Sequence, residues 1–245
     1  MSRTAAPGAP ATVDATALRH RLDEGLAQLG GAAAALDEAA RDRSVRFVVL
    51  LAKWNRVHNL TAVRDARAMI GRHLLDSLSL LPWIDGRDGV GNHPSGHEPD
   101  AFDLLDIGSG AGLPVLPLAI ARPGLHCLSV ESNNKRTGFQ RQASLELGLS
   151  GVEVRQVRIE TVSARARTVV SRAFAAPADF LAAAAPRCAP GGTALVMLGR
   201  AERLPEPLPA PFSLVTLHAL EVPFESAERH LAVCRIGEET RRSGR

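Results

Sequence analysis

The sequence predicts an α/β fold, in which a helical extension precedes a mostly parallel sheet with an antiparallel strand at its C-terminal end. Three observations predict it. Apolar residues recur at helical spacing up to about residue 84, short apolar runs then alternate with helical stretches, and a glycine-rich loop joins the first run to a helix. Such alternation is typical of βαβ units, whose strands are parallel. The last two predicted strands have no clear helix between them, which indicates an antiparallel hairpin.

The helical extension covers residues 14–84 and is predicted to hold three helices. The first carries leucines at helical spacing and is broken at Gly30–Gly31, and the second carries apolar residues from Leu36 to Trp54. Trp54 is predicted to belong to the core.

The third predicted helix runs from about Ala66 to Leu81, with Asp65 as its N-cap and Pro82 as its stop. His73 and Asp76 lie three positions apart on it, so their side chains can touch. A structural hydrogen bond or ion pair is favoured over a catalytic role for this pair.

The remaining segments follow from composition and pattern. Residues 85–101 are rich in Gly, Pro, Asp and His and predict a loop or linker. Residues 1–13 predict a disordered start, and residues 237–245 a flexible basic tail. Within residues 102–236 the predicted strands are 102–107, 126–131, 152–157, 168–171, 193–198, 214–220 and 230–235, and the predicted helices are 113–121, 134–147 and 178–185.

Composition narrows the class of protein. The chain has 245 residues, of which 45% are hydrophobic and 22% charged, as in ordinary globular proteins. Its three cysteines are too few and scattered for a disulfide framework or a metal site. No apolar stretch reaches membrane-spanning length, so we expect a cytoplasmic protein without membrane or metal partners. The pI of about 9.1 just reaches the level at which nucleic-acid binding becomes plausible.

The loop DIGSGAG, Asp106–Gly112, predicts a cofactor site. Glycines at 108, 110 and 112 permit a tight turn against which a ligand can lie, and the next helix is expected to offer free N–H groups. A dinucleotide fingerprint would need glycine where Leu113 stands, which disfavours a nicotinamide-dependent oxidoreductase. The tighter G-x-G-x-G spacing after an acidic residue favours S-adenosylmethionine, with Gly108 and Gly110 as contacts.

Glu131 ends the second predicted strand, 19 residues after Gly112. A carboxylate at this place can accept hydrogen bonds from both hydroxyls of a ribose. The loop and the acid together predict a Rossmann-like class I methyltransferase domain over residues 102–236.

The residues after the fourth predicted strand are expected to face the methyl acceptor. They read Ser171-Arg172-Ala173-Phe174, without the Asn/Asp-Pro-Pro-aromatic pattern of enzymes that methylate exocyclic amines. Enzymes that methylate C5 of pyrimidines need a cysteine nucleophile, and Cys188 precedes the fifth strand instead of ending the fourth.

Longer stretches resemble the ribosomal RNA small-subunit methyltransferase G family, also called glucose-inhibited division protein B. The matching stretches include KWNRVHNLTAVRD (Lys53–Asp65), RHLLDS (Arg72–Ser77), LLDIGSGAGLPVLPLAI (Leu104–Ile120), SRAF (Ser171–Phe174) and ERHL (Glu228–Leu231). The resemblance spans most of the chain, about Lys53 to Arg235. It implies methyl transfer from S-adenosylmethionine to N7 of a guanine in small-subunit ribosomal RNA, either naked or in the small ribosomal particle.

The resemblance also assigns residues. The family's cofactor contacts fall on Gly108, Leu113, Ile159, Glu160 and Arg172 in this sequence.

Residues of the reacting centre follow in the same way. Arg172 and Arg158 resemble family arginines near that centre, and Phe174 offers a ring on which a base can stack. An ordinary salt-bridged surface arginine is the alternative interpretation of both, with a functional role favoured for Arg172 and neither interpretation favoured for Arg158. Guanine N7 carries a lone pair and no proton, so positioning without a general base is sufficient chemistry.

One departure from the family concerns the fifth strand. The family usually has Ala-Leu-Lys-Gly at its end, whereas this chain has Val196-Met197-Leu198-Gly199, with Arg200 as a possible substitute for the lysine. Two alternatives therefore stay open: methylation of another RNA position, and a catalytically impaired ribosome-binding protein of the same fold.

Basic residues of the extension are candidate phosphate contacts, with a solvated helix face as the plainer interpretation. They are Lys53, Arg56, Arg64, Arg67 and Arg72.

Overall fold

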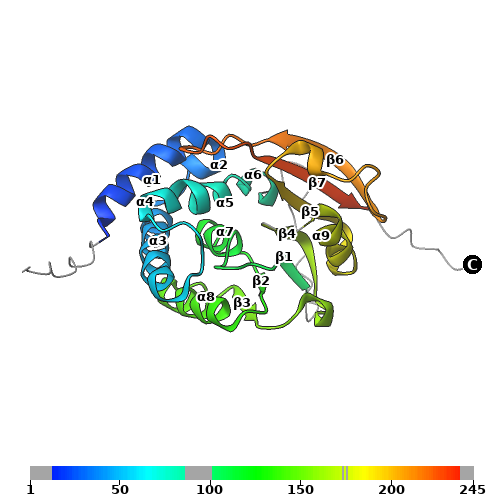
Figure 1. The fold of residues 1–245 in the computed structure, drawn as a ribbon, viewed down its shortest axis with the longest axis horizontal. Helices are drawn as coiled ribbons and strands as arrows, with labels where there is room; N and C mark the ends of the chain where they lie inside the picture. Colours follow the sequence, from blue (N-terminus) through cyan, green and yellow to red (C-terminus); the bar gives the residue numbers. More distant parts are fainter. Residues whose placement is uncertain (1–12, 86–100, 173, 175, 238–245) are drawn as a thin grey trace, which may run out of the picture.

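The computed structural model describes residues 13–85, 101–172, 174 and 176–237. The predictions for residues 1–13, 85–101 and 237–245 therefore fall almost wholly outside the described residues. The described chain forms a seven-stranded sheet in the order β3-β2-β1-β4-β5-β7-β6, with the helices of the extension around one side (Figure 1). This architecture confirms the predicted fold class.

All seven predicted strands are present, with ends shifted by a few residues. They are β1 Ala101–Ile107, β2 Cys127–Val130, β3 Val152–Arg155, β4 Arg165–Ser171, β5 Cys188–Leu198, β6 Phe212–Ala219 and β7 His230–Ile236. Strands β1 to β5 pair in parallel, and β7 pairs antiparallel with both β5 and β6. The carboxyl ends of the parallel strands therefore share one edge, where ligands of such sheets bind.

The sheet domain has three α-helices among the described residues. They are α7 Val115–Ala121, α8 Asn134–Leu147 and α9 Pro177–Ala184, and short 3-10 turns are η2 Ile159–Thr161, η3 Ala185–Arg187 and η4 Ala201–Arg203. The predicted start of α7 at Leu113 is wrong. The backbone N–H groups of Gly112 and Leu113 both donate to the carbonyl of Ser109, at 2.9 Å each, so a tight turn precedes the helix.

The extension contains the first two predicted helices and a more irregular third. Its elements are α1 Ala15–Leu29, α2 Gly31–Ala34, α3 Glu38–His58, α4 Ala66–Met69, the π-helical segment η1 Ile70–Leu75, α5 Asp76–Leu78 and α6 Leu81–Ile84. Pro82 is not a stop, contrary to prediction. It lies in the first turn of α6, where a missing N–H costs little.

The extension shares its core with the sheet domain. Leu22 of α1 and Phe47 of α3 are fully buried in one cluster with Leu116 of α7 and Phe139 of α8. The rings of Phe47 and Phe139 lie 6.1 Å apart between centroids. The extension is therefore a layer packed on the sheet's helices, so it can position groups at the site. No described helix is long and apolar enough to cross a membrane.

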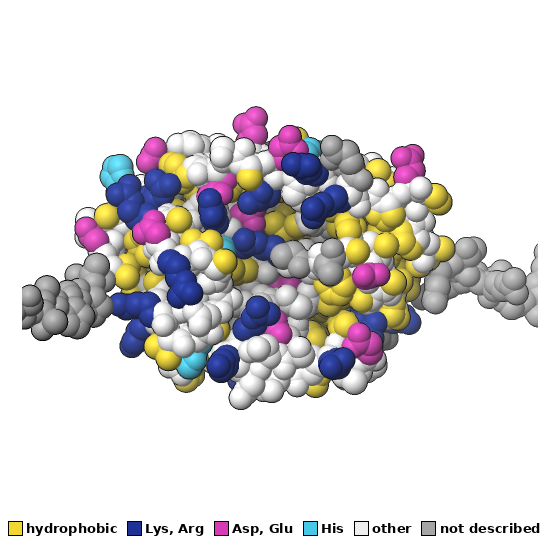
Figure 2. Space-filling view, in the orientation of Figure 1, with side chains coloured by type: hydrophobic (Ala, Val, Ile, Leu, Met, Phe, Trp, Pro, Cys, Tyr) yellow, Lys and Arg dark blue, Asp and Glu magenta, His cyan; other side chains and the backbone are white. Residues whose placement is uncertain are grey.

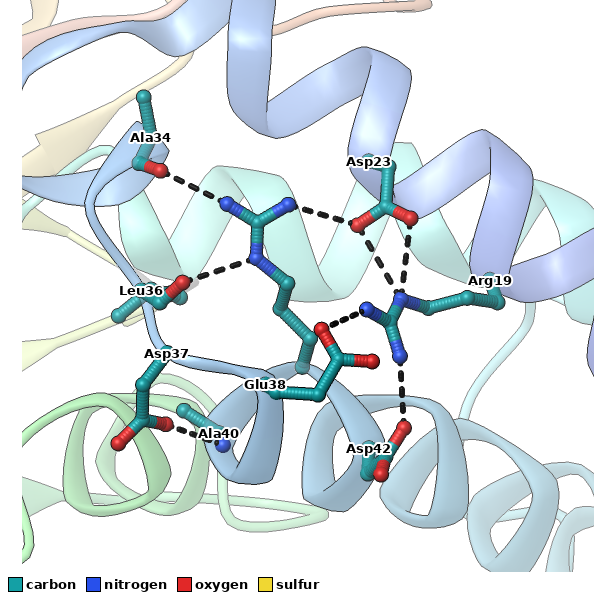
Figure 3. A network of polar contacts seen from close by, with 9 residues as sticks. Arg19, Asp23, Ala34, Leu36, Asp37, Glu38, Ala40 and Asp42 are labelled. Carbon is teal, nitrogen blue, oxygen red and sulfur yellow. Dashed lines mark hydrogen bonds and ion pairs between the residues drawn. The ribbon is translucent and has the colours of Figure 1, made fainter.

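A polar network fastens α1 to α3 (Figure 3). The guanidinium of Arg19 contacts Asp23 of its own helix and reaches Glu38 and Asp42 of α3, at 2.6 Å each. Arg41 of α3 returns to Asp23 at 2.9 Å. These contacts fix the angle between the two outer helices.

Candidate active site

The glycine loop between β1 and α7 leaves open space beside its backbone. Gly108 and Gly110 have φ angles of +69° and +57°, which side chains rarely adopt, and a Cβ built on either meets no atom within 4 Å. At Gly112 a Cβ would instead lie 2.5 Å from Leu116. The first two glycines therefore face a potential ligand, whereas the third permits close packing.

A buried hydrogen-bond network holds this loop in shape. The hydroxyls of Ser109 and Ser129 lie 2.6 Å apart, and Gln140 of α8 donates to Ser109 Oγ and to the carbonyl of Gly110. Ser129 donates in turn to Gln140 Oε1. Because all three side chains are buried, the loop is fixed before any ligand arrives.

Asp106, the penultimate residue of β1, is fully buried, and its side chain accepts a hydrogen bond from the first residue of α7. Its Oδ2 accepts from the N–H of Val115 at 3.2 Å, while its Oδ1 has no partner among the described residues. Burial raises the pKa of Asp106 well above its usual value. The expectation of free N–H groups at this helix start is wrong, because the protein's own carboxylate occupies Val115.

Glu131 follows β2 and lies against the same loop. Its Oε2 accepts from the N–H of Gly110 at 2.9 Å and its Oε1 from Asn133 at 2.8 Å, while Arg136 stands 3.5 Å away. Each carboxylate oxygen keeps a further lone pair. The acid is thus held in one orientation and can still accept hydroxyl groups.

One cavity of about 370 Å³, here called the cofactor cavity, gathers most of the predicted contacts. It is lined by Ile107, Gly108, Val130, Glu131, Ser132, Val157, Arg158, Ile159, Glu160 and Phe174. Leu113, Gly110 and Arg172 are not among these lining residues. Leu113 is 8% exposed and packs in the core.

A second cavity of about 260 Å³, here called the acceptor cavity, lies at the ends of β4 and β5. It is lined by Asp76, Arg172, Phe174, Pro177, Met197, Leu198, Gly199, Arg203 and Arg229. Phe174 borders both cavities. Leu198 contributes apolar surface to the acceptor cavity. Arg203 lines the cavity, whereas Arg200, the expected substitute for the family's lysine, is not among the lining residues.

Arg172 sits at the centre of a buried network. Its Nε contacts Asp76 Oδ2 at 3.1 Å, and its Nη2 donates to the carbonyl of Arg72 and to His73 Nδ1. Its Nη1 is buried and has no partner among the described residues. Asp76 also receives Arg229, at 3.3 Å. The guanidinium thus connects His73 to Asp76, in place of the direct contact predicted between them.

His73 is held as the neutral imidazole. Burial, together with the charge of Arg172, lowers the pKa of His73 to about 4. Since Nδ1 accepts from Arg172, Nε2 carries the proton and donates to Thr61 Oγ1 at 2.8 Å. His73 therefore orients the arginine and does not add a charge.

The KWN-x-x-x-NLT stretch explains how Thr61 is positioned. Asn55 of α3 is 2% exposed; its amide accepts from the N–H of Thr61 and donates to the carbonyl of Val63, at 2.8 Å each. Trp54 packs against Phe139 in the core, as predicted. The stretch thus forms a rigid turn behind His73.

The residues in and beside the two cavities include candidate groups for a zwitterionic nucleoside cofactor. Asp106 Oδ1, an acceptor, and Arg172 Nη1, a donor, are both buried without a partner among the described residues, and each group influences the pKa of the other. Such a pair matches an ammonium and a carboxylate on one amino-acid end. The open faces of Gly108 and Gly110 and the carboxylate of Glu131 match the nucleoside end. The described residues contain no cluster of metal ligands.

The sequence is similar to one family of known proteins. The family model described as rRNA small subunit methyltransferase G matches residues 41–231. Proteins named ribosomal RNA small subunit methyltransferase G are similar: that of Aromatoleum aromaticum is 42% identical over 86% of this chain and 96% of its own, and that of Chromohalobacter salexigens 44% identical over 88% and 96%.

Solved structures share the fold at low identity. Magnesium protoporphyrin IX methyltransferase from Synechocystis PCC 6803, with bound SAM, superposes with a TM-score of 0.54 at 15% identity, covering 83% of this chain and 99% of that one. TrmN from Thermus thermophilus gives 0.51 at 19% identity over 65% and 48%. Both likenesses concern the fold alone.

Proposed function

The chain belongs to the rRNA small subunit methyltransferase G family, and from this premise we propose that it transfers the methyl group of S-adenosylmethionine to N7 of a guanine in small-subunit ribosomal RNA. The observation that carries the proposal is that the cofactor cavity and the acceptor cavity meet at Phe174. A methyl donor in one and a base in the other would share this residue.

Each end of the cofactor has candidate residues. Arg172, which lines the acceptor cavity, would take the carboxylate of the methionine end, and Glu131, which lines the cofactor cavity, the ribose hydroxyls. Ile159 and Glu160 would border the adenine, because they line the same cavity. The bound cofactor supplies an electrophilic methyl group on its sulfonium.

The acceptor cavity favours a nucleophile that has no proton to lose. Asp76 is the carboxylate among its described lining residues, and both of its oxygens are engaged by Arg172 and Arg229. It is therefore poorly suited as a general base. Guanine N7 needs none, because it presents a lone pair on the major-groove edge.

A cysteine mechanism is disfavoured by geometry and by protonation. Strand β5 runs from Cys188 to Leu198, so Cys188 lies at the end of the strand away from the acceptor cavity. Burial raises the pKa of Cys188 to about 12, which keeps the thiol protonated and poorly nucleophilic. This supports a direct transfer to the base.

The substrate is ribosomal RNA, presented either naked or in the small particle, and we place the reaction in the cytoplasm, where such particles assemble. Figure 2 shows many Lys and Arg side chains, interspersed with acidic ones, over the left and upper parts of one face of the molecule, which suits an RNA substrate.

Labelled cofactor, incubated with the protein and small subunits lacking the family's methyl mark, tests whether transfer to RNA occurs. We expect label in the RNA. Binding to subunits without transfer would favour the impaired ribosome-binding alternative.

Cofactor binding is tested separately by calorimetry with a matched pair of glycines. Gly108→Ala is expected to weaken S-adenosylmethionine about 100-fold, because the new Cβ fills the face left open for the ligand. Gly148 has a similar φ of +67° and equally open surroundings, but it ends α8. Gly148→Ala should therefore cost similar stability and leave affinity unchanged. Equal affinities for the two variants would refute the cofactor placement.

A further inference from the structure

Two arginines of the acceptor cavity are not committed to the cofactor, and they differ in how they are held. Arg229 is fixed by Asp76 and by the carbonyl of Glu228, at 3.3 and 2.9 Å. Arg203 is exposed, and no ion pair or side-chain hydrogen bond links it to another described residue. A guanidinium held in one orientation suits recognition of the edge of a base. A guanidinium that is free to move at the opening of the cavity suits contact with a phosphate.

We propose that Arg203 contacts the RNA phosphate backbone beside the target nucleotide while its base occupies the acceptor cavity. The inference rests on the proposed function, because it requires an RNA substrate at this cavity.

The local structure holds Arg203 at the cavity. The turn η4 is closed by hydrogen bonds from the backbone N–H of Arg203 to Arg200 and from Leu204 to Ala201. Leu204 then packs against the core cluster under β4 and β5. The backbone is thus anchored, and only the side chain of Arg203 is free to move.

The charge balance of the cavity supports a phosphate partner. Asp76, its described acid, is already shared by Arg172 and Arg229, so the positive charge of Arg203 has no counterpart there. Leu198, at the end of β5, adds only apolar surface. An anion at the opening of the cavity would compensate the positive charge of Arg203, and each nucleotide of an RNA carries one phosphate.

The same turn provides a matched control. Arg200 is also exposed, lacks an ion pair to the described residues and precedes Arg203 by three positions, but it does not line the cavity. Any effect of net charge alone should therefore be equal for Arg200→Met and Arg203→Met. Both side chains are exposed, so neither change should lower the melting temperature.

The experiment measures binding of small ribosomal subunits that lack the methyl mark, over a range of salt concentrations. For Arg203→Met we expect a Kd raised about threefold to tenfold at low salt and a slope of log Kd against log salt reduced by about 1. Arg203→Lys should recover most of the affinity, because lysine binds phosphate as a point charge. Arg200→Met should match the wild type.

Two outcomes would overturn the inference: equal effects of the two methionine variants, or weaker binding by Arg203→Met with an unchanged salt slope, which would indicate a base contact. Calorimetry with S-adenosylmethionine should give wild-type affinity for both variants. Because the readout is binding, it decides about Arg203 even if wild-type protein fails to methylate N7, and a methylation failure would refute the proposed function alone.

Discussion

The molecule contains two arginine networks, which differ in how many of their guanidinium nitrogens have hydrogen-bond or ion-pair partners. In the α1–α3 network, all three guanidinium nitrogens of Arg19 contact carboxylates, and those of Arg41 reach Asp23 and two backbone carbonyls (Figure 3). In the network around Arg172, one guanidinium nitrogen is buried without a partner. Every guanidinium nitrogen of the first network therefore has a partner, whereas the second network leaves one nitrogen, Arg172 Nη1, without one.

The balance of charge differs in the same direction. The α1–α3 network joins two arginines to three carboxylates that are 38% to 75% exposed. The other joins Arg172 and Arg229 to Asp76 alone, which is 3% exposed. The ion pairs of the outer network are thus exposed and weakened by solvent, whereas the inner network has an excess of guanidinium groups around one buried carboxylate. Such an excess is what an anionic ligand group requires.

Removing one arginine from each network should have the largest effect on activity. Arg172→Met should lower kcat/KM for methyl transfer on the order of 100-fold or more, since it deletes the unpaired donor. Arg41→Met should lower stability by about 1 kcal/mol and leave kcat/KM unchanged. Transfer of labelled methyl groups measures both. Similar losses of activity would show that the two networks do not differ in role.

Removing one carboxylate from each network tests how the burial of an ion pair affects stability. Asp76→Asn leaves two partly exposed arginines, 21% and 26% accessible, without their shared counter-charge and should cost about 2 kcal/mol of unfolding free energy. Asp42→Asn, at a side chain 64% exposed, should change it by less than about 0.5 kcal/mol. Urea unfolding checks this, and comparable costs would contradict the conclusion that solvent weakens the ion pairs of the outer network.

The inner network contains a histidine, His73, that should make stability depend on pH. The pKa of His73 falls to about 4 in the folded protein, below the unfolded value near 6.5, so acid favours the unfolded chain. Between about pH 6.5 and pH 4 the wild type should lose up to about 3 kcal/mol relative to His73→Asn, whose side-chain oxygen still accepts from Arg172. Above pH 7 this difference should level off. Unfolding at pH 7 and pH 4.5 measures it, and parallel curves for both proteins would exclude a buried neutral histidine.

Local patterns were sufficient to predict the sheet and the loop. Strands such as β1 are short apolar runs, and the helix α8 is bounded by a side-chain cap at Asn133 and by Gly148, so their positions follow from neighbouring residues. Glu131 could be predicted for the same reason, because it directly follows a strand whose carboxyl end faces the ligand.

Long-range contacts account for what could not be predicted. The start of α7 depends on Asp106, nine positions earlier, and the carbonyl of Arg72 in the π-helical segment η1 accepts from Arg172, one hundred positions away. Arg203 and Arg229 reach one cavity only because β5 and β7 pair. Patterns among neighbouring residues in the sequence cannot indicate contacts between residues that are far apart along the chain.

The measurement that tests the central claim most directly is the identity of the methylated nucleoside. Small subunits lacking the mark are incubated with the protein and labelled S-adenosylmethionine, and their RNA is then digested to nucleosides and separated. We expect the label to elute as 7-methylguanosine. Label in a nucleoside methylated on an exocyclic amine, on a pyrimidine carbon or on the ribose would contradict it.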